Sequence, residues 1–369
     1  MNTTPFALKA FLFCIPPALL VLFPFFVLII SGELTPITKR IALQQASERE
    51  LLLTKSYYPF PEDIRLETYR TLWPDITILG NSRVYQFRRE FFSGDTRFYA
   101  AADFGVGLRR IFNEFFTLTD GGSDPNIILI GLEQSMFIES YEEKPPPEEP
   151  NALLIIRRVY GDYWSKKFSL RDIVGGRLTS DSLGIRALVV RAGTRKDGSE
   201  RYGAVIENPH DPAYWDYAFL GTFERIDIEH PLFRYGADLS PVFLSELTAF
   251  LDEAKRRGVH VVAFLPPYAP SVFAYMQSKG DAYAYIPKIY PAIRKEFTKR
   301  GFSLFDFTDA TALGSSDEEF LDGNHGSEKS TARMLLTMAA SDSELARVTD
   351  FPGLTEALKS ATSNLELFK

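Results

Sequence analysis

Residues 76–87 read ITILGNSRVYQF, a short β-rich apolar run followed at once by a Gly-Asn-Ser turn. The run at 76–79 is typical of a buried strand, and the next segment, VYQFRREFF, has the composition of a helix. Ser82 therefore lies just past a strand, either as a nucleophile or as the polar start of a helix. Which of the two applies depends on the residues that the rest of the chain brings to it.

Further runs along the chain repeat this strand pattern, with helical segments between them. The other expected strands are RFYAAA (97–102), NIILIGL (126–132), VHVVAFL (259–265) and FSLFDF (302–307). NIILIGL is apolar throughout, which is typical of a strand covered on both faces. Strands that alternate with helices predict a doubly wound parallel sheet, and we expect one three-layer α/β domain over residues 57–345.

The chain outside these strands falls into segments of different character. Residues 10–30 carry no charged side chain, over roughly the 20 residues that a hydrocarbon core requires. We therefore expect 1–31 to be an uncleaved transmembrane helix, with a cleaved signal peptide as the alternative. Residues 32–56 are expected to be a helical connector and 346–369 a C-terminal tail. The long irregular stretch 135–239, after the third strand, is expected to form an insertion or cap over the carboxyl edge of the sheet.

Composition narrows the classes of function. The net charge is -7 and no basic stripe is present, so we expect no nucleic-acid partner. The single cysteine, Cys14, cannot form an intrachain disulfide or a thiolate metal cluster. We expect neither a metal nor a cofactor, and a domain without cysteines fits an extracytoplasmic location.

Four histidines are candidates for a catalytic base. His210 and His230 lie in the irregular stretch beside prolines and acids, and His260 begins a strand and so lies at the opposite edge of the sheet. His325 follows Asp322 by three residues in DGNH. That spacing allows the carboxylate to reach imidazole Nδ1 while Nε2 points toward a nucleophile. An ordinary Asp-Gly-Asn turn with an incidental histidine is the alternative.

Two motifs resemble those of the SGNH/GDSL hydrolase superfamily. ILGNSR, with Ser82, resembles the first block, which holds the nucleophile. DGNH, with Asp322 and His325, resembles the last block, D-x-x-H. The resemblance implies a flavodoxin-like α/β fold and a catalytic triad of Ser82, Asp322 and His325.

The blocks between these two depart from the family pattern. AAADFG resembles the second block, which implies that the amides of Gly105 and Ser82 form an oxyanion hole. IGLEQ stands where the third block has an asparagine donor, but Glu133 occupies that position. The third donor is then Gln134 or some other group, or it is absent. Asn81 replaces the aspartate of the first block.

Further side chains are candidate substrate contacts. Arg83, beside Ser82, is suited to bind a carboxylate or phosphate of the substrate, or to pair with an acid at the sheet edge. Glu133 is a second candidate. The aromatic residues of the irregular stretch are suited either to stack on sugar rings or to pack locally; they include Tyr214, Trp215, Tyr217 and Phe219.

Within the superfamily, the chain most resembles membrane-anchored bacterial proteins of alginate-type O-acetylation and lipoteichoic acid D-alanylation. The resemblance implies a single-pass protein of the bacterial cytoplasmic (inner) membrane with a periplasmic catalytic domain. It implies an O-acetyltransferase or esterase that acts on an exopolysaccharide or another acylated surface glycan. A membrane-bound acyl-donor protein is an expected partner. The alternative is a catalytically inactive relative that binds polysaccharide or scaffolds an envelope complex.

Overall fold

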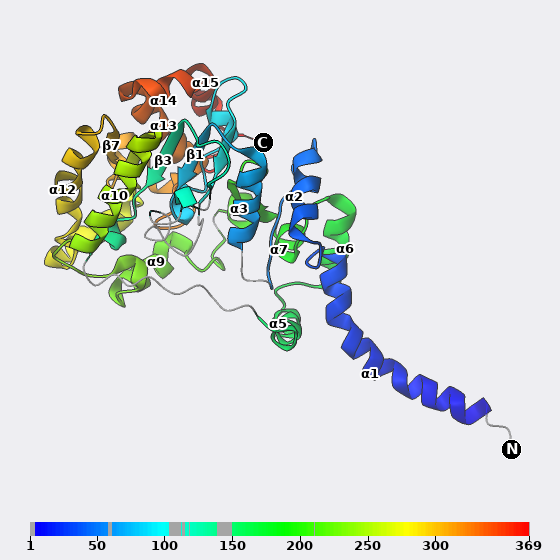
Figure 1. Cartoon of the computed structure of the whole chain (residues 1–369). Helices are drawn as coiled ribbons and strands as arrows, with labels where there is room; N and C mark the ends of the chain where they lie inside the picture. The colour runs from blue at the N-terminus through cyan, green and yellow to red at the C-terminus, as the bar shows by residue number, and fades with distance from the viewer. Residues whose placement is uncertain are drawn as a thin grey trace. The chain divides into compact units, whose positions relative to one another are not determined.

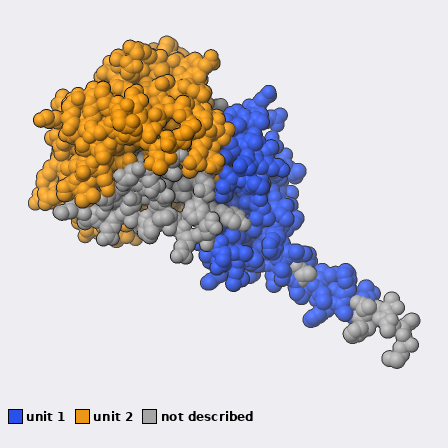
Figure 2. Space-filling model, viewed as in Figure 1, with its two compact units in different colours: residues 1–61, 147–196 blue, residues 62–146, 197–369 orange. Residues whose placement is uncertain are grey.

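The computed structural model describes residues 4–57, 61–102, 112, 115–117, 119–138, 150–209 and 211–368. These residues form two compact units, each with a hydrophobic core of its own (Figure 2). Unit 1 comprises residues 1–61 and 147–196, and unit 2 comprises residues 62–146 and 197–369.

Unit 2 is built on a five-stranded parallel sheet with the strand order β2-β1-β3-β6-β7. Its strands are β1 (Ile76–Leu79), β2 (Phe98–Ala100), β3 (Ile127–Gly131), β6 (His260–Leu265) and β7 (Ser303–Asp306). All five strands expected from the sequence are confirmed. The order reverses between β1 and β3, and the crevice beyond the carboxyl ends at such a point is where open α/β sheets bind ligands.

Helices cover both faces of this sheet, and alternate residues of each strand enter different cores because side chains alternate along a strand. In β3, Ile128 and Ile130 join one core, whereas Ile127 and Leu129 join the other. The first core contains side chains of α3 (Pro61–Leu72), α10 (Pro241–Arg257), α11 (Pro270–Ser278) and α12 (Ile286–Thr298). The second contains side chains of α13 (Glu328–Ser341), α14 (Ser343–Val348) and α15 (Phe351–Ser360). The arrangement is α/β and compatible with a three-layer fold (Figure 1).

Shorter elements connect these parts of unit 2. The 3-10 helices are η1 (Ser82–Val84), η2 (Arg89–Phe91), η3 (Gln134–Phe137), η4 (Tyr217–Phe219), η5 (Pro231–Phe233), η6 (Gly280–Tyr283), η7 (Ala310–Leu313) and η8 (Asp317–Glu319). The others are β5 (Glu200–Tyr202), α8 (Gly203–Glu207) and α9 (Leu220–Asp227).

The expected C-terminal tail, 346–369, belongs to the core of unit 2. Leu354 of α15 is fully buried in the second core. The backbone amides of Leu367 and Phe368 both donate to Glu328 of α13, at 2.8 and 3.2 Å. The apolar side of α15 needs a surface to cover it, and α13 provides that surface, so the α/β unit extends beyond residue 345.

Unit 1 contains helices from both of its chain segments. They are α1 (Thr4–Ile30), α2 (Ile37–Ala46), α5 (Ala152–Trp164), α6 (Leu170–Thr179) and α7 (Ile185–Val189), with strand β4 (Ala192–Thr194). Val27 and Leu28 of α1 pack in one core with Ile155 and Val159 of α5 and with Ile173 of α6. The expected insertion 135–239 is therefore divided: residues 147–196 pack with the N-terminal segment, and only its remainder belongs to unit 2.

A buried arginine fixes the chain where it leaves α1. Arg40 is fully buried and donates to the carbonyl oxygens of Thr35, Thr54 and Gly32, at 2.9, 2.7 and 2.5 Å. Its guanidinium lies 4.0 Å from the buried carboxylate of Glu33. The expected connector 32–56 is thus an integral part of unit 1.

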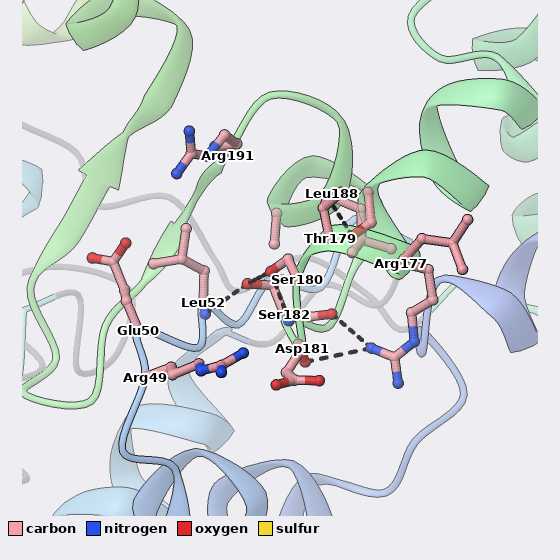
Figure 3. A pocket seen from close by; sticks show the side chains of 13 residues that line it. Arg49, Glu50, Leu52, Arg177, Thr179, Ser180, Asp181, Ser182, Leu188 and Arg191 are labelled. Atoms are coloured by element: carbon pink, nitrogen blue, oxygen red, sulfur yellow. Dashed lines mark hydrogen bonds between the residues drawn. The ribbon is translucent and has the colours of Figure 1, made fainter.

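Unit 1 also contains a polar cavity of about 480 Å³ (Figure 3). Arg49, Arg177 and Arg191 line it, and so do the carboxylates of Glu50 and Asp181. The Arg177 guanidinium holds one wall by donating to the carbonyl oxygens of Asp181 and Ser182, at 3.4 and 3.0 Å. The mixed charges of the lining leave no single ligand chemistry favoured there.

The N-terminal apolar segment forms helix α1, which contains Pro16, Pro17 and Pro24. Among the described residues, no single helix has the length and hydropathy of a membrane span. The segments Leu8–Pro17 and Leu19–Ile30 reach that hydropathy and length only together, across a bend of 48°.

Candidate active site

The turn after β1 is held by residues other than the side chain of Ser82. Asn81, not Ser82, caps the short helix η1, because its side-chain oxygen accepts from the Arg83 amide at 3.0 Å. Gly131 of β3 has no room for a side chain, since a Cβ there would lie 2.4 Å from Val84 of the same turn. Val84 is fully buried, so the turn is anchored in the core and presents Ser82 at its start.

Ser82, His325 and Asp322 form a continuous hydrogen-bonded relay. Ser82 Oγ lies 2.7 Å from His325 Nε2. On the other side of the ring, His325 Nδ1 lies 2.8 Å from both carboxylate oxygens of Asp322. The geometry expected from the sequence is confirmed, and it is that of a nucleophile, a general base and an orienting carboxylate.

The Asp322 carboxylate is held in its ionised form. It is buried, and its Oδ1 also accepts from the backbone amides of Asn324 and His325, at 3.0 and 2.9 Å. Burial alone would raise the pKa of Asp322, but the charge of His325 and these hydrogen bonds outweigh it and keep the pKa below its usual range. An ionised carboxylate at this place can orient the imidazole and stabilise a positive charge on it.

A third loop, which sequence patterns did not reveal, supports Asp322 and His325. Asp216 is buried, and its Oδ2 accepts from the Gly323 amide at 2.9 Å and from the Thr222 hydroxyl at 2.7 Å. Its Oδ1 accepts from the Thr222 amide at 2.6 Å. Burial raises the pKa of Asp216 although these hydrogen bonds act in the opposite direction. Asp216 therefore positions the loop that carries Asp322 and His325.

Arg83 and Glu133 are buried and paired with each other, which corrects the expectation that their side chains contact a substrate. Both side chains are buried, and Arg83 Nη1 donates to Glu133 at 2.6 Å. Arg83 Nη2 donates to the carbonyl oxygens of Pro266 and Pro267, at 2.9 and 2.6 Å. The guanidinium also lies over the Tyr268 ring, 4.3 Å from its centroid. Of the two roles expected for Arg83, the geometry is that of the ion pair.

The same network uses both carboxylate oxygens of Glu133. Asn81 Nδ2 donates to the second oxygen at 2.8 Å. Glu133 occupies the position that holds an oxyanion donor in the SGNH/GDSL pattern. It links the nucleophile turn to the end of β3 by accepting hydrogen bonds from Asn81 and Arg83. A buried, hydrogen-bonded carboxylate stands where the SGNH/GDSL pattern that the sequence resembles has its asparagine.

Gln134 is also unsuited to the oxyanion role expected for it. Its side chain is fully buried, and its Nε2 donates to the carbonyl oxygen of Pro266 at 2.7 Å and to the Thr308 hydroxyl at 3.0 Å. Its oxygen accepts from Arg83 at 2.8 Å. Within the described part of the chain, the Ser82 amide has no acceptor and stays available as an oxyanion donor. Gly105 lies outside the described residues.

The other histidines have the places expected for residues outside the site. His260 lies at the amino end of β6, where its Nε2 is 2.8 Å from Asp342. His230 Nδ1 accepts from the Leu232 amide at 3.3 Å and caps η5. His210 lies outside the described residues. Of the three histidines that the structure describes, only His325 reaches a serine hydroxyl.

Aromatic residues lie along the chain next to Asp216. Trp215 and Tyr217 are 45% and 41% exposed. The Arg225 guanidinium lies 4.1 Å from the centre of the Trp215 ring, so Trp215 packs locally on one face. Tyr202 lies beside the His325 imidazole, with 6.0 Å between the ring centroids. An aromatic ring therefore flanks the relay at His325.

The described residues contain no group of His, Cys, Asp and Glu side chains arranged to hold a metal ion. Comparison of the chain with protein-family models, with curated proteins and with solved structures finds no match. The evidence for function is therefore the geometry of the site itself.

Proposed function

We propose that this protein is an SGNH-like serine acyl-transfer enzyme. The observation that carries the proposal is the relay from Ser82 Oγ through His325 to Asp322, at 2.7 and 2.8 Å. A serine hydroxyl needs such a base to attack an acyl carbon. The five-stranded order β2-β1-β3-β6-β7, with the nucleophile after β1 at the reversal point, supports the flavodoxin-like fold that this family has.

The reaction that fits this geometry has two halves. Ser82 Oγ attacks the carbonyl carbon of an ester while its proton passes to His325 Nε2, and Asp322 stabilises the imidazolium. The Ser82 amide donates to the oxyanion. Collapse breaks the ester C–O bond, and His325 returns the proton to the leaving alcohol. Water or a sugar hydroxyl then attacks the acyl-enzyme with His325 as base, giving hydrolysis or acyl transfer.

For the substrate class we propose an O-acylated surface polysaccharide, acted on by an O-acetyltransferase or esterase. The exposed rings of Trp215 and Tyr217 support this substrate class. They flank Asp216, which holds the loop of Asp322 and His325 through the Gly323 amide. Aromatic faces suit the C–H surfaces of sugars. A membrane-bound acyl-donor protein would be the partner of a transferase.

For the location we propose a single-pass attachment of α1 to a bacterial cytoplasmic membrane, with unit 2 in the periplasm. The support is the apolar surface of α1, whose side chains from Leu19 to Leu22 are each 58–63% exposed. Unpaired apolar surface of this extent is unusual for a helix in water.

One observation favours the second candidate function, a catalytically inactive glycan-binding or scaffolding protein. Glu133 and Gln134 are both committed to the buried network, so the third oxyanion donor of the family pattern is absent from its usual position. An oxyanion-hole donor contributes about 10²–10³ in turnover. Its loss would weaken catalysis without removing the nucleophile.

Covalent labelling with a fluorophosphonate separates the two candidates. We expect the detergent-solubilised full chain to be labelled at Ser82, and Ser82→Ala to lose the label and about 10⁴-fold or more of ester cleavage. Ser278→Ala is a matched control, because the Ser278 hydroxyl is exposed and donates only to a helix carbonyl. An unlabelled, folded wild-type chain would favour the binding protein.

A further inference from the structure

Helix α5 has one face buried in unit 1 and another that none of the described residues covers. Ile155 and Val159 pack in the core of unit 1 with Val27 and Leu28 of α1. Leu153 and Trp164 are 75% and 70% exposed. They are about three helical turns apart, with Arg157 between them, so the three side chains lie on one side of the helix. We call Leu153, Arg157 and Trp164 the outer face of α5.

A ladder of aromatic rings joins this outer face to α1. Phe23 of α1 stacks on Tyr160 of α5, with 5.4 Å between the ring centroids, and Tyr160 stacks on Trp164 at 5.1 Å. The Tyr160 hydroxyl donates to the carbonyl oxygen of Leu20. Helix α5 therefore packs beside the C-terminal half of α1, within the same unit (Figure 1).

The surface of α1 at this level is apolar as well. Leu19, Leu20, Val21 and Leu22 are all more than half exposed. Single exposed apolar residues are ordinary, but a continuous apolar surface marks a membrane or a partner. The exposed leucines of α1 and the outer face of α5 form such a surface.

The charge around α5 distinguishes between these occupants. Arg157, Arg158 and Lys166 are exposed, and none has an ion-pair partner among the described residues. Over the whole sequence, unit 1 has fifteen Lys and Arg against eight Asp and Glu, a net charge of +7, and the remaining chain has a net charge of -14. Apolar and aromatic side chains beside basic ones are typical of a helix that lies in the interface of an anionic membrane.

We propose that α5 is a second membrane-contacting element, which lies in the headgroup region of an anionic bilayer beside α1. Leu153 and Trp164 enter the boundary between headgroups and acyl chains, while Arg157, Arg158 and Lys166 bind lipid phosphates. This inference rests on α1 entering the same membrane, but not on the chemistry of Ser82. Fluorophosphonate labelling and lipid contact therefore succeed or fail separately.

Trp164 makes the contact measurable, because the other two tryptophans, Trp73 and Trp215, belong to unit 2. The full chain is reconstituted into vesicles of phosphatidylcholine and phosphatidylglycerol whose acyl chains are brominated. We expect bromine to quench part of the tryptophan emission, and Trp164→Phe to lose that quenching. Trp215→Phe is the matched control, since Trp215 is an exposed tryptophan outside unit 1, and it should retain the quenching.

The charge arm of the experiment replaces Arg157 and Arg158 by glutamine. The ratio of lipid-contacting to free α5 should fall about fivefold for each charge removed, and the loss should vanish in pure phosphatidylcholine. Acrylamide, which quenches tryptophan from the water phase, tests the opposite placement of Trp164. The proposal is overturned if acrylamide quenches Trp164 and brominated lipid does not. It is also overturned if neither quencher reaches Trp164, because a second copy of the chain would then cover the outer face of α5.

Discussion

Each unit contains a buried arginine–glutamate pair, one beside the nucleophile turn and one at the end of α1. The two pairs differ in geometry. Arg83 and Glu133, beside the nucleophile turn, are in contact at 2.6 Å. Arg40 and Glu33, at the end of α1, lie 4.0 Å apart, and Arg40 uses its donors on backbone carbonyls instead. The contact pair holds two chain segments through its charges. The separated pair holds two chain segments mainly through the hydrogen bonds of Arg40 to backbone carbonyls. The pKa of Glu33 is therefore set mainly by burial.

The catalytic relay of unit 2 is where the largest effect is expected. Asp322→Asn keeps the size of the side chain but allows the wrong imidazole tautomer, so turnover should fall roughly 10⁴-fold. Rates of ester cleavage, with circular dichroism as a check on folding, measure this. Asp216→Asn is the comparison variant, because Asp216 touches the loop but not the imidazole, and its loss of turnover should be much smaller. Equal losses in the two variants would contradict the roles given to them.

The next largest effect concerns the contact pair. Arg83→Met leaves Glu133 buried without its cation, which should cost roughly 3–5 kcal/mol of the free energy of unfolding. Denaturant unfolding of the solubilised chain measures the loss. Arg97→Met breaks the exposed pair with Asp75, 2.7 Å apart, and should cost less than about 1 kcal/mol.

A double variant tests whether charge or packing matters at this pair. Arg83→Met combined with Glu133→Met removes both charges, and much of the lost stability should return, as is often found for buried pairs. Fluorophosphonate labelling should not return with it, because Asn81 loses its acceptor and the nucleophile turn its attachment to β3. Recovery of both would show that the pair does not position Ser82.

The smallest effect is expected at the separated pair. Burial raises the pKa of Glu33, although the charge of Arg40 and hydrogen bonds from Ile185 and Ser56 lower it. A carboxyl with a raised pKa in the folded state binds its proton more tightly than in the unfolded chain. The stability that it contributes is present at low pH and is lost as the pH rises through the folded pKa, by no more than about 1.4 kcal/mol per pH unit.

Trp164, the only tryptophan of unit 1, reports this pH dependence in thermal unfolding. Glu33→Gln should flatten the dependence of the unit 1 transition between weakly acidic and neutral pH. Glu48→Gln, at an exposed position, should leave it as in the wild type. A wild-type transition that is already flat over this range would show that Glu33 stays ionised.

The strands and the relay were open to prediction because each has a local signature. The five apolar runs mark the five strands, of which β1, β2, β3 and β6 are buried along nearly all of their length. D-x-x-H at Asp322 and His325 has the spacing that a carboxylate needs to reach its own imidazole. The parallel sheet then requires the end of β1 to lie near loops at the same edge. Long-range pairing of Ser82 with His325 followed from these local facts.

The supporting residues had no such signature. Asp216 and Gly323 are more than a hundred residues apart in the chain. An aspartate between aromatic residues has the same sequence pattern whether its side chain is buried or exposed. The division of the irregular stretch was equally hidden. The apolar side of α5, with Ile155 and Val159, has the same periodicity whether it covers a sheet or packs on α1. Sequence shows that a face must be covered, but not by what.

The order of the relay along the chain also bears on when activity can begin. Ser82 precedes His325 by 243 residues, and strands β2, β3, β6 and β7 of the sheet lie between them in the chain. During synthesis the nucleophile leaves the ribosome long before its base does, and a lone serine hydroxyl does not attack esters. Under the proposed function, the chain would therefore have no acyl-transfer activity until its last loop docks against the first strand. Chain order alone would then keep the serine unreactive during synthesis and export, without an inhibitor or a propeptide.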